Sequence, residues 1–304
     1  MIDDPLPEFA FRRAGHDRLT DRRADQAFVD AAWADPATRV VVLRGGELAV
    51  TGDGSALATR KPPPDSGPTM LLGRADGVVY FLLIEDLEAV DAEAHSERDE
   101  FRPLRAIAET LDPVQASLAV QAVALAQWHA RHPRCAVCGG PTEITMAGEC
   151  RRCTDCGSQH FPRTDPAVIM LVVDDEDRCL LGHNAARDEA WYSTLAGFVE
   201  PGESLEDAVV REVAEETGVV VDRVEYAGSQ PWPFPSSLMV GFLAHASGTA
   251  IAVDGVEITK ARWFTRGQLR AEVEAGALVI PTTLSISGAL VQSWYGAPLP
   301  ARRP

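Results

Sequence analysis

The chain has 304 residues and a formal net charge of −17 at pH 7, which argues against a protein that holds DNA or RNA along a broad basic face. Hydrophobic residues make up 46% of the sequence, so one large core or two smaller ones can form. The longest apolar runs are only as long as strands, and the acidic start of the chain has no apolar core segment. We therefore expect a cytoplasmic protein without a signal peptide or a membrane span.

Residues 1–112 predict a β-rich N-terminal domain. Its strands are expected at Arg39–Leu43, Glu47–Val50, Thr69–Leu72 and Val78–Ile84. Gly45 and Gly46 are typical of a hairpin between the first two strands. Residues 84–101 are acidic and should be exposed. No motif here indicates chemistry, so we expect a scaffold or dimerisation role.

Residues 113–163 predict a long helix followed by a metal-binding ribbon. All six cysteines lie between residues 135 and 179, just downstream of the alanine-rich helix expected at Pro113–Arg131. Clustered cysteines in a cytosolic chain indicate a metal site rather than a disulfide framework. Two Cys-x2-Cys pairs have the spacing of a zinc ribbon: Cys135, Cys138, Cys153 and Cys156. Four thiolates leave no open coordination position, which indicates one structural Zn²⁺ per chain.

The second cysteine pair has an alternative partner, because Cys150 also stands three residues before Cys153. We favour Cys153 with Cys156, since the glycine after Cys156 permits the turn that directs two thiolates at one ion. Cys150 is then a spare thiol. Cys179 lies in an apolar run and is expected in the core.

Residues 164–304 mix strands and helices in the way expected of an α/β/α sandwich around a mixed sheet. The expected strands are Ala167–Val173, Arg178–Leu181, Trp191–Leu195, Val224–Gly228, Leu238–Ala246 and Ile258–Phe264, and the expected late helices are Gln268–Ala275 and Leu284–Tyr295.

A glycine loop and a short acidic helix occupy residues 197–219. Ser204, with Asp207 three residues later, predicts a helix that begins near Leu205, and Gly218 predicts its end. At 100° per residue, two glutamates fall in the apolar sector of this helix and a third lies at its edge: Glu212, Glu216 and Glu215. Buried carboxylates repel each other, so a divalent cation with oxygen ligands is the expected partner.

This stretch resembles the complete Nudix box. The matching positions are Gly197, Glu203, Arg211, Glu212, Val213, Glu215, Glu216, Gly218 and Val219. The resemblance implies a hydrolase in which Glu212, Glu215 and Glu216 hold Mg²⁺ or Mn²⁺. It further assigns Glu216 as the general base, Glu203 to the metal or water shell, and Arg211 to orienting the glutamates by ion pairing.

A second motif, SQPWPFPSS at Ser229–Ser237, follows the box. Its three prolines stiffen a segment that carries Trp232 and Phe234, which suits stacking against a flat ring, although packing in a core or dimer interface is the alternative. The stretch resembles the signature of the NADH pyrophosphatase family of Nudix hydrolases, whose members also have a zinc ribbon and an N-terminal domain.

The family resemblance implies hydrolysis of NADH or NAD⁺ at the pyrophosphate, giving the nicotinamide mononucleotide and AMP, and removal of NAD caps from RNA 5′ ends. It implies a homodimer in which the aromatic segment of one subunit helps to form its partner's pocket. Carried over position by position, it assigns substrate contacts to Phe198, Gln230, Trp232, Phe161, Ile169 and Ser287, and a further metal ligand to Glu257. Phe161 stands where the family has a tyrosine, so a hydroxyl contact is absent there.

Two other functions remain open from the sequence. A Nudix hydrolase of another dinucleotide, such as ADP-ribose or a diadenosine polyphosphate, has the same box. A binding scaffold for nucleotide or RNA without catalysis is the other alternative, and the intact glutamates argue against it.

Overall fold

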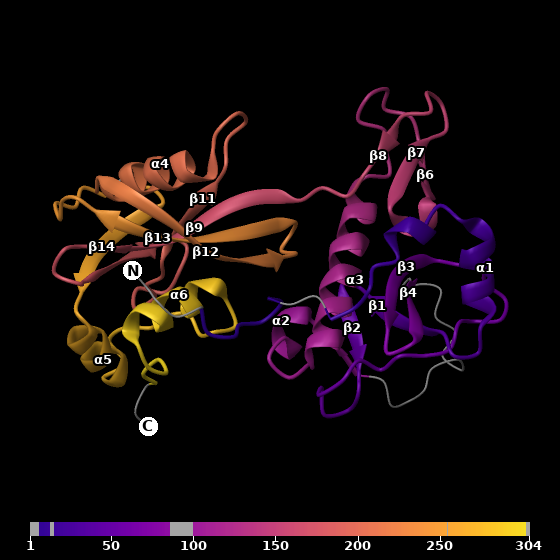
Figure 1. The fold of residues 1–304 in the computed structure, drawn as a ribbon, viewed down its shortest axis with the longest axis horizontal. Coiled ribbons are helices and arrows are strands. Elements are labelled where there is room, and N and C mark those ends of the chain that lie inside the picture. Colours follow the sequence, from indigo (N-terminus) through magenta and orange to yellow (C-terminus); the bar gives the residue numbers. More distant parts are fainter. Residues whose placement is uncertain (1–5, 13–14, 86–99, 254, 302–304) are drawn as a thin grey trace. The chain divides into compact units, whose positions relative to one another are not determined.

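The computed structural model describes residues 6–12, 15–85, 100–253 and 255–301. The chain forms two compact units (Figure 1). The N-terminal unit comprises Arg13–Thr164 and Trp232–Ser236, and the C-terminal unit comprises Met1–Arg12, Asp165–Pro231 and Ser237–Pro304. In the described residues, no helix combines the length and apolarity that a membrane crossing needs.

The N-terminal unit is built on a five-stranded mixed sheet with the order β3-β4-β1-β2-β5. The strands are β1 (Arg39–Arg44), β2 (Glu47–Val50), β3 (Met70–Ala75), β4 (Val78–Glu85) and β5 (Glu100–Arg102). β1 runs parallel to β4, and the other neighbours are antiparallel. The predicted hairpin is therefore confirmed. β5 was not predicted, and most of the acidic stretch before it lies outside the described residues.

Helices cover this sheet. They are η1 (Thr20–Arg22), α1 (Gln26–Ala34), α2 (Leu104–Ile107) and α3 (Pro113–Arg131). Trp33 of α1 packs edge-on against Phe81 of β4, with ring centroids 5.1 Å apart, in one hydrophobic cluster. α3 has the predicted bounds because Asp112 caps its first backbone N–H groups and Pro113 occupies the first turn.

A small three-stranded ribbon stands at the C-terminal end of α3 (Figure 1). It consists of β6 (Thr142–Thr145), η2 (Met146–Gly148), β7 (Cys150–Cys153) and β8 (Gln159–His160). His129 joins α3 to this ribbon: its Nε2–H donates to the carbonyl of Gly148 at 2.8 Å, and its Nδ1 accepts from Arg151 at 3.2 Å. The imidazole is thus held in its neutral form, and burial lowers the pKa of His129 to about 4.

Acid should therefore destabilise the N-terminal unit through His129. The unfolded chain takes up this proton near pH 6.5 and the folded chain near pH 4, so the free energy of unfolding falls as the pH drops through that window. We expect a loss of about 2 kcal/mol after allowance for solvent screening. Urea unfolding of the wild type and of His129→Gln between pH 7 and pH 4 measures it. Loss of the ribbon's metal at low pH would destabilise both proteins equally, so it does not change the difference between their free energies of unfolding. If that difference stays the same from pH 7 to pH 4, the assignment to His129 is wrong.

The C-terminal unit is built on a six-stranded sheet with the order β12-β13-β9-β10-β14, and β11 also pairs with β9. The strands are β9 (Asp165–Val173), β10 (Cys179–Asn184), β11 (Leu195–Phe198), β12 (Val221–Trp232), β13 (Ser237–Ala246) and β14 (Ile258–Phe264). β13 runs parallel to β9, whereas β10 and β11 are antiparallel to it. The sheet is therefore mixed, as predicted.

Helices pack on both faces of this sheet: α4 (Leu205–Thr217) on one, and α5 (Arg266–Glu274) with α6 (Ile286–Tyr295) on the other. The alternation along β9 shows the two layers. Val168 and Met170 belong to the cluster under α4, whereas Ile169 and Leu171 belong to the cluster under α5 and α6. The predicted α/β/α sandwich is confirmed.

Three details of this unit differ from the sequence prediction. The strand expected at Trp191–Leu195 lies at Leu195–Phe198, because the glycine-containing end pairs with β9. The motif of prolines and aromatic residues begins inside a strand, since β12 continues to Trp232. Leu6 and Phe9 pack in the C-terminal core although they lie at the start of the chain. The division at residues 112 and 163 stays a prediction.

Candidate active site and metal centre

The acidic helix α4 is positioned by both of its ends. Ser204 accepts a hydrogen bond from the backbone N–H of Asp207 at 3.1 Å, and Gly218 closes the helix with a φ of 69°. Ala208, Val209 and Val213 turn toward the sheet and are fully buried. The packing of this apolar stripe fixes the rotation of the helix, and with it the directions of the glutamates.

Arg211 lies at the centre of the carboxylates of the box. Its guanidinium donates to both oxygens of Glu203 at 2.7 and 2.9 Å, to Glu212 at 2.8 Å and to Glu215 at 3.0 Å. It also donates to the backbone carbonyl of Phe198 at 3.0 Å. The ion pairing predicted for Arg211 is therefore present, and it joins the glycine loop to α4. One cation offsets part of the repulsion among three carboxylates.

Glu203 has a structural role in this arrangement. Besides Arg211, it accepts a hydrogen bond from the backbone N–H of Glu200 at 2.9 Å. The hydrogen bonds from Arg211 and Glu200 lower the pKa of Glu203 to about 2. Glu203 is thus ionised at neutral pH, and its hydrogen bonds connect the loop at Glu200 to Arg211 of α4. Its assignment as a metal ligand stays a prediction.

The other predicted metal ligands differ in exposure. Glu216 is only 5% exposed, whereas the side chain of Glu215 is 62% exposed. Glu257 lies just before β14, where its carboxylate contacts Asn184 at 3.4 Å, and the Arg211 network does not include it. In the part of the chain that the structure describes, the four ribbon cysteines are the one metal-type group whose ligand atoms all lie within 4.8 Å of one another. The glutamates of the box are therefore more widely spaced.

Gly197 leaves a hollow for the carboxylate of Glu212. A Cβ atom at residue 197 would lie 1.9 Å from Cδ of Glu212 and 2.0 Å from its Oε1, well inside contact distance. This hollow and the all-carboxylate donor set fit a hard divalent cation such as Mg²⁺ or Mn²⁺. From the sequence, Gly197 is expected to let the loop turn tightly. The structure adds a second reason for a glycine, which is the close approach of the Glu212 carboxylate.

We expect Gly197→Ala to lower turnover by about 100-fold, because the new methyl group displaces the carboxylate of Glu212 by an ångström or more. The thermal midpoint should change little. Turnover and Mn²⁺ affinity are the measurements, and Gly248→Ala is the matched control, since nothing lies within 4 Å of a Cβ there. Wild-type Mn²⁺ affinity and turnover in Gly197→Ala would show that the position of Glu212 does not matter.

Three predicted substrate-binding residues lie in the packed interior of the C-terminal unit. The side-chain amide of Gln230 donates to the carbonyls of Ala10 and Leu284 and accepts from the N–H of Ile286. Ser287 exchanges a hydrogen bond with Thr194 at 2.8 Å, and Ile169 belongs to the core. None of the three is more than 7% exposed. Gln230 thus ties the start of the chain to α6, and the substrate roles of all three stay predictions.

The predicted aromatic residues are more accessible. Phe198 is 60% exposed and Phe161 is 56% exposed. Trp232 meets Phe234 edge-on with ring centroids 5.2 Å apart. The guanidinium of Arg105 lies over both rings, 5.1 Å from the first centroid and 4.2 Å from the second.

This aromatic pair packs within the N-terminal unit. Gln127 of α3 donates to the carbonyl of Pro233 at 3.0 Å and so fixes the turn between the two rings. Arg105 was missed by the sequence analysis, because its helix carries no motif and its partners lie far along the chain. Trp232 therefore already has a cationic partner on one side.

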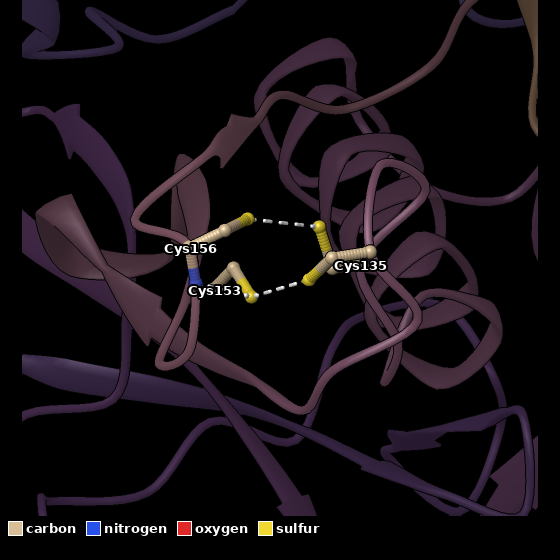
Figure 2. Close-up of side chains that lie close together, drawn as sticks. Cys135, Cys153 and Cys156 are labelled. Atoms are coloured by element: carbon tan, nitrogen blue, oxygen red, sulfur yellow. Dashed lines mark hydrogen bonds between the residues drawn. The ribbon is translucent and has the colours of Figure 1, made fainter.

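The ribbon brings the four predicted zinc ligands together. Figure 2 shows Cys135, Cys153 and Cys156 with their sulfur atoms directed toward one another. The Sγ atoms of Cys135 and Cys156 lie 3.7 Å apart, and those of Cys138 and Cys153 lie 3.5 Å apart. Tetrahedral Zn²⁺ with bonds of about 2.3 Å requires a sulfur separation of about 3.8 Å. The donor set and its spacing fit Zn²⁺.

The clustered sulfur atoms include that of Cys156 and not that of Cys150, which favours the predicted pairing of Cys153 with Cys156. Cys150 and Cys179 are completely buried, which confirms Cys179 as a core residue. His160 was missed: its Nε2 lies 3.2 Å from Sγ of Cys135. Its position four residues after Cys156 was the available signal.

Comparison with known proteins agrees with this geometry. The NUDIX domain family matches residues 163–281, and the family described as an NADH pyrophosphatase-like rudimentary NUDIX domain matches residues 37–128. The chain belongs to the Nudix hydrolase family. Within that family it belongs to the NADH pyrophosphatases, which have this second, reduced domain. The N-terminal domain was thus described too simply from sequence, which gave no sign of its Nudix ancestry.

Similar proteins span nearly the whole chain. "NAD-capped RNA hydrolase NudC" of Mycobacterium bovis (strain BCG / Pasteur 1173P2) is 38% identical over 302 residues, covering 93% of both chains. NudC of Mycobacterium tuberculosis (strain H37Rv) shows the same identity and coverage. "NAD-capped RNA hydrolase NUDT12" of Homo sapiens is 40% identical over 236 residues, which cover 72% of this chain and 51% of the human protein.

Proposed function

We propose that the protein hydrolyses the pyrophosphate of NADH or NAD⁺, giving the nicotinamide mononucleotide and AMP, and that it removes NAD caps from RNA 5′ ends. The observation that carries this proposal is the Arg211 network, in which the guanidinium of Arg211 binds the carboxylates of Glu203, Glu212 and Glu215. Glu216 lies on the same helix and is buried. The relatives named NAD-capped RNA hydrolases support the substrate class.

The residues of the box divide the chemistry between them. Glu212, Glu215 and Glu216 would hold Mg²⁺ or Mn²⁺, which when bound offsets the charge of the pyrophosphate and acidifies a water molecule. We assign the proton of the attacking water to Glu216, because its carboxylate lies one helical turn from Glu212 on the same face of α4 and is only 5% exposed. Arg211 keeps Glu212 and Glu215 in place and does not need to touch the substrate.

The surroundings of the box would provide substrate recognition. Phe198 follows Gly197 directly and exposes its ring, which suits stacking against nicotinamide. Trp232 is proposed as a second stacking surface for the substrate, and within its own unit the guanidinium of Arg105 lies 5.1 Å from the centroid of its ring. Glu257 is proposed as a further metal ligand.

The remaining assignments concern the state of the protein. We propose that one Zn²⁺ per chain is held by the four ribbon cysteines in a structural role, because four thiolates close the coordination shell. We also propose a cytoplasmic homodimer. Sedimentation equilibrium tests the dimer.

Product analysis tests the proposed reaction. The purified protein is incubated with NADH and Mn²⁺, and in parallel with ADP-ribose and with an NAD-capped RNA. AMP and reduced nicotinamide mononucleotide, with NADH preferred, and a 5′-monophosphate on the RNA are the expected products. A strong preference for ADP-ribose would favour another dinucleotide hydrolase. Binding without cleavage of any of the three would indicate a scaffold.

A further inference from the structure

The acidic composition leaves few cations free to meet a polyanion. With a net charge of −17, the chain repels RNA at a distance, so attraction must come from cations that no carboxylate already neutralises. Within residues 6–12, 15–85, 100–253 and 255–301, four Arg and Lys side chains make no hydrogen bond, ion pair, ring contact or other electrostatic interaction: Lys61, Arg131, Arg134 and Arg152. Three of these four lie at the end of α3 or in the ribbon. The side chain of Arg18 also makes no hydrogen bond with the described residues, but its charge interacts with that of Glu149.

Strand register places two of these arginines on the same side of the ribbon. Arg134 pairs with Pro141, Glu143 pairs with Arg152, and Arg152 pairs with Gln159. Partners across a strand pair point to the same side, and so do alternate residues along one strand. All five residues are exposed. We call this surface the ribbon face.

The opposite side of the ribbon serves the metal centre. Thr142 pairs with Cys153, and Arg151 pairs with His160. Arg151 and Cys153 are buried, and Arg151 bonds to His129 and to Thr142. The ribbon face is therefore the side of the strands opposite to Cys153 and the buried Arg151.

We propose that the ribbon face, with Arg131 three residues before Arg134 in the chain, contacts the phosphodiester chain of the RNA that follows an NAD cap. This proposal rests on the proposed function for its substrate. Guanidinium groups pair with phosphate oxygens, and a single strand loses counterions at each such contact. Glu143 lies between the two arginines and makes no ion pair with either, so it weakens the contact and provides a test of opposite sign.

Direct binding tests the proposal without any cleavage. A 20-nucleotide RNA with a 5′-monophosphate and a 3′-fluorescein is titrated with protein at several salt concentrations, and anisotropy is followed. For Arg134→Ala/Arg152→Ala we expect affinity to fall at least about fivefold and the slope of log affinity against log salt to become shallower by about 1.4, two contacts at about 0.7 each. Glu143→Gln should bind RNA more tightly than the wild type.

Matched controls separate this face from general charge effects. Lys61→Ala removes another unpaired cation away from the ribbon and should leave affinity and slope unchanged. Metal content and melting temperature of the double variant should equal those of the wild type. With free NAD⁺ its kcat/KM should also be unchanged, whereas with NAD-capped RNA it should fall several-fold.

Two results would overturn the inference. One is wild-type affinity and salt slope in the double variant. The other is an equal loss of RNA affinity in Lys61→Ala, which would show that the effect depends on net charge and not on the ribbon face. Failure of the proposed function looks different: the wild type would cleave neither NAD⁺ nor capped RNA, while the binding measurement would still report on the ribbon face.

Discussion

Glu216→Gln should lower turnover of NADH by about 100- to 10,000-fold while the protein stays folded, the range that loss of a general base produces. Glutamine has the same shape as glutamate but cannot accept the proton of the attacking water. Glu216 is only 5% exposed, so few water molecules can reach this position and accept the proton in place of the missing carboxylate. Steady-state kinetics with saturating Mn²⁺ and a thermal melt measure the two parts of the prediction.

The control for this variant lies on the same helix. Glu206→Gln removes an equal charge from the exposed side of the first turn of α4 and should leave turnover unchanged. Mn²⁺ affinity distinguishes the two roles of Glu216: a variant that binds Mn²⁺ normally but turns over slowly has lost a base, and a variant that binds it weakly has lost a ligand. Near-normal turnover would remove Glu216 from both roles.

Cys153→Ser should lose the bound metal and strongly destabilise the N-terminal unit. Structural Zn²⁺ contributes about 10–16 kcal/mol in small zinc domains, and a hydroxyl in place of one thiolate breaks the closed shell. Cys153 is also 2% exposed and pairs with Thr142 across β6 and β7, so the substitution disturbs a buried part of the ribbon. Metal content by mass spectrometry and unfolding followed by circular dichroism are the measurements.

Cys150→Ala is the matched control for the metal centre. Cys150 is completely buried three residues earlier, but its Sγ is not among the clustered sulfur atoms. This variant should keep one metal ion per chain and lose only packing energy. If instead Cys153→Ser keeps its metal, Cys150 has moved into the shell and the assigned pairing is wrong.

The elements governed by neighbouring residues could be predicted from the sequence. α3 has its predicted bounds because an aspartate cap, a proline and a run of alanines act within a few residues of each other. α4 begins at Leu205 for the same kind of reason. The ribbon cysteines were identified because ligand spacing is a local property of the chain.

What the sequence missed depends on contacts between distant segments. The position of β11 is set by the pairing of Leu195–Phe198 with β9, which a local pattern does not show. The partners of Gln230 are Ala10 and Leu284, and Arg105 meets Trp232. No short pattern marks such residues. The unpaired arginines of the ribbon are a similar case, since only the structure tells which charges are already neutralised.

The discontinuous C-terminal unit has a consequence for synthesis on the ribosome. Leu6 and Phe9 belong to the same core as Leu290 and Trp294 of α6. Leu6 and Phe9 are therefore synthesised long before the α6 residues against which they pack, and this part of the core can form only after α6 has left the ribosome. The N-terminal unit can complete most of its sheet in the meantime.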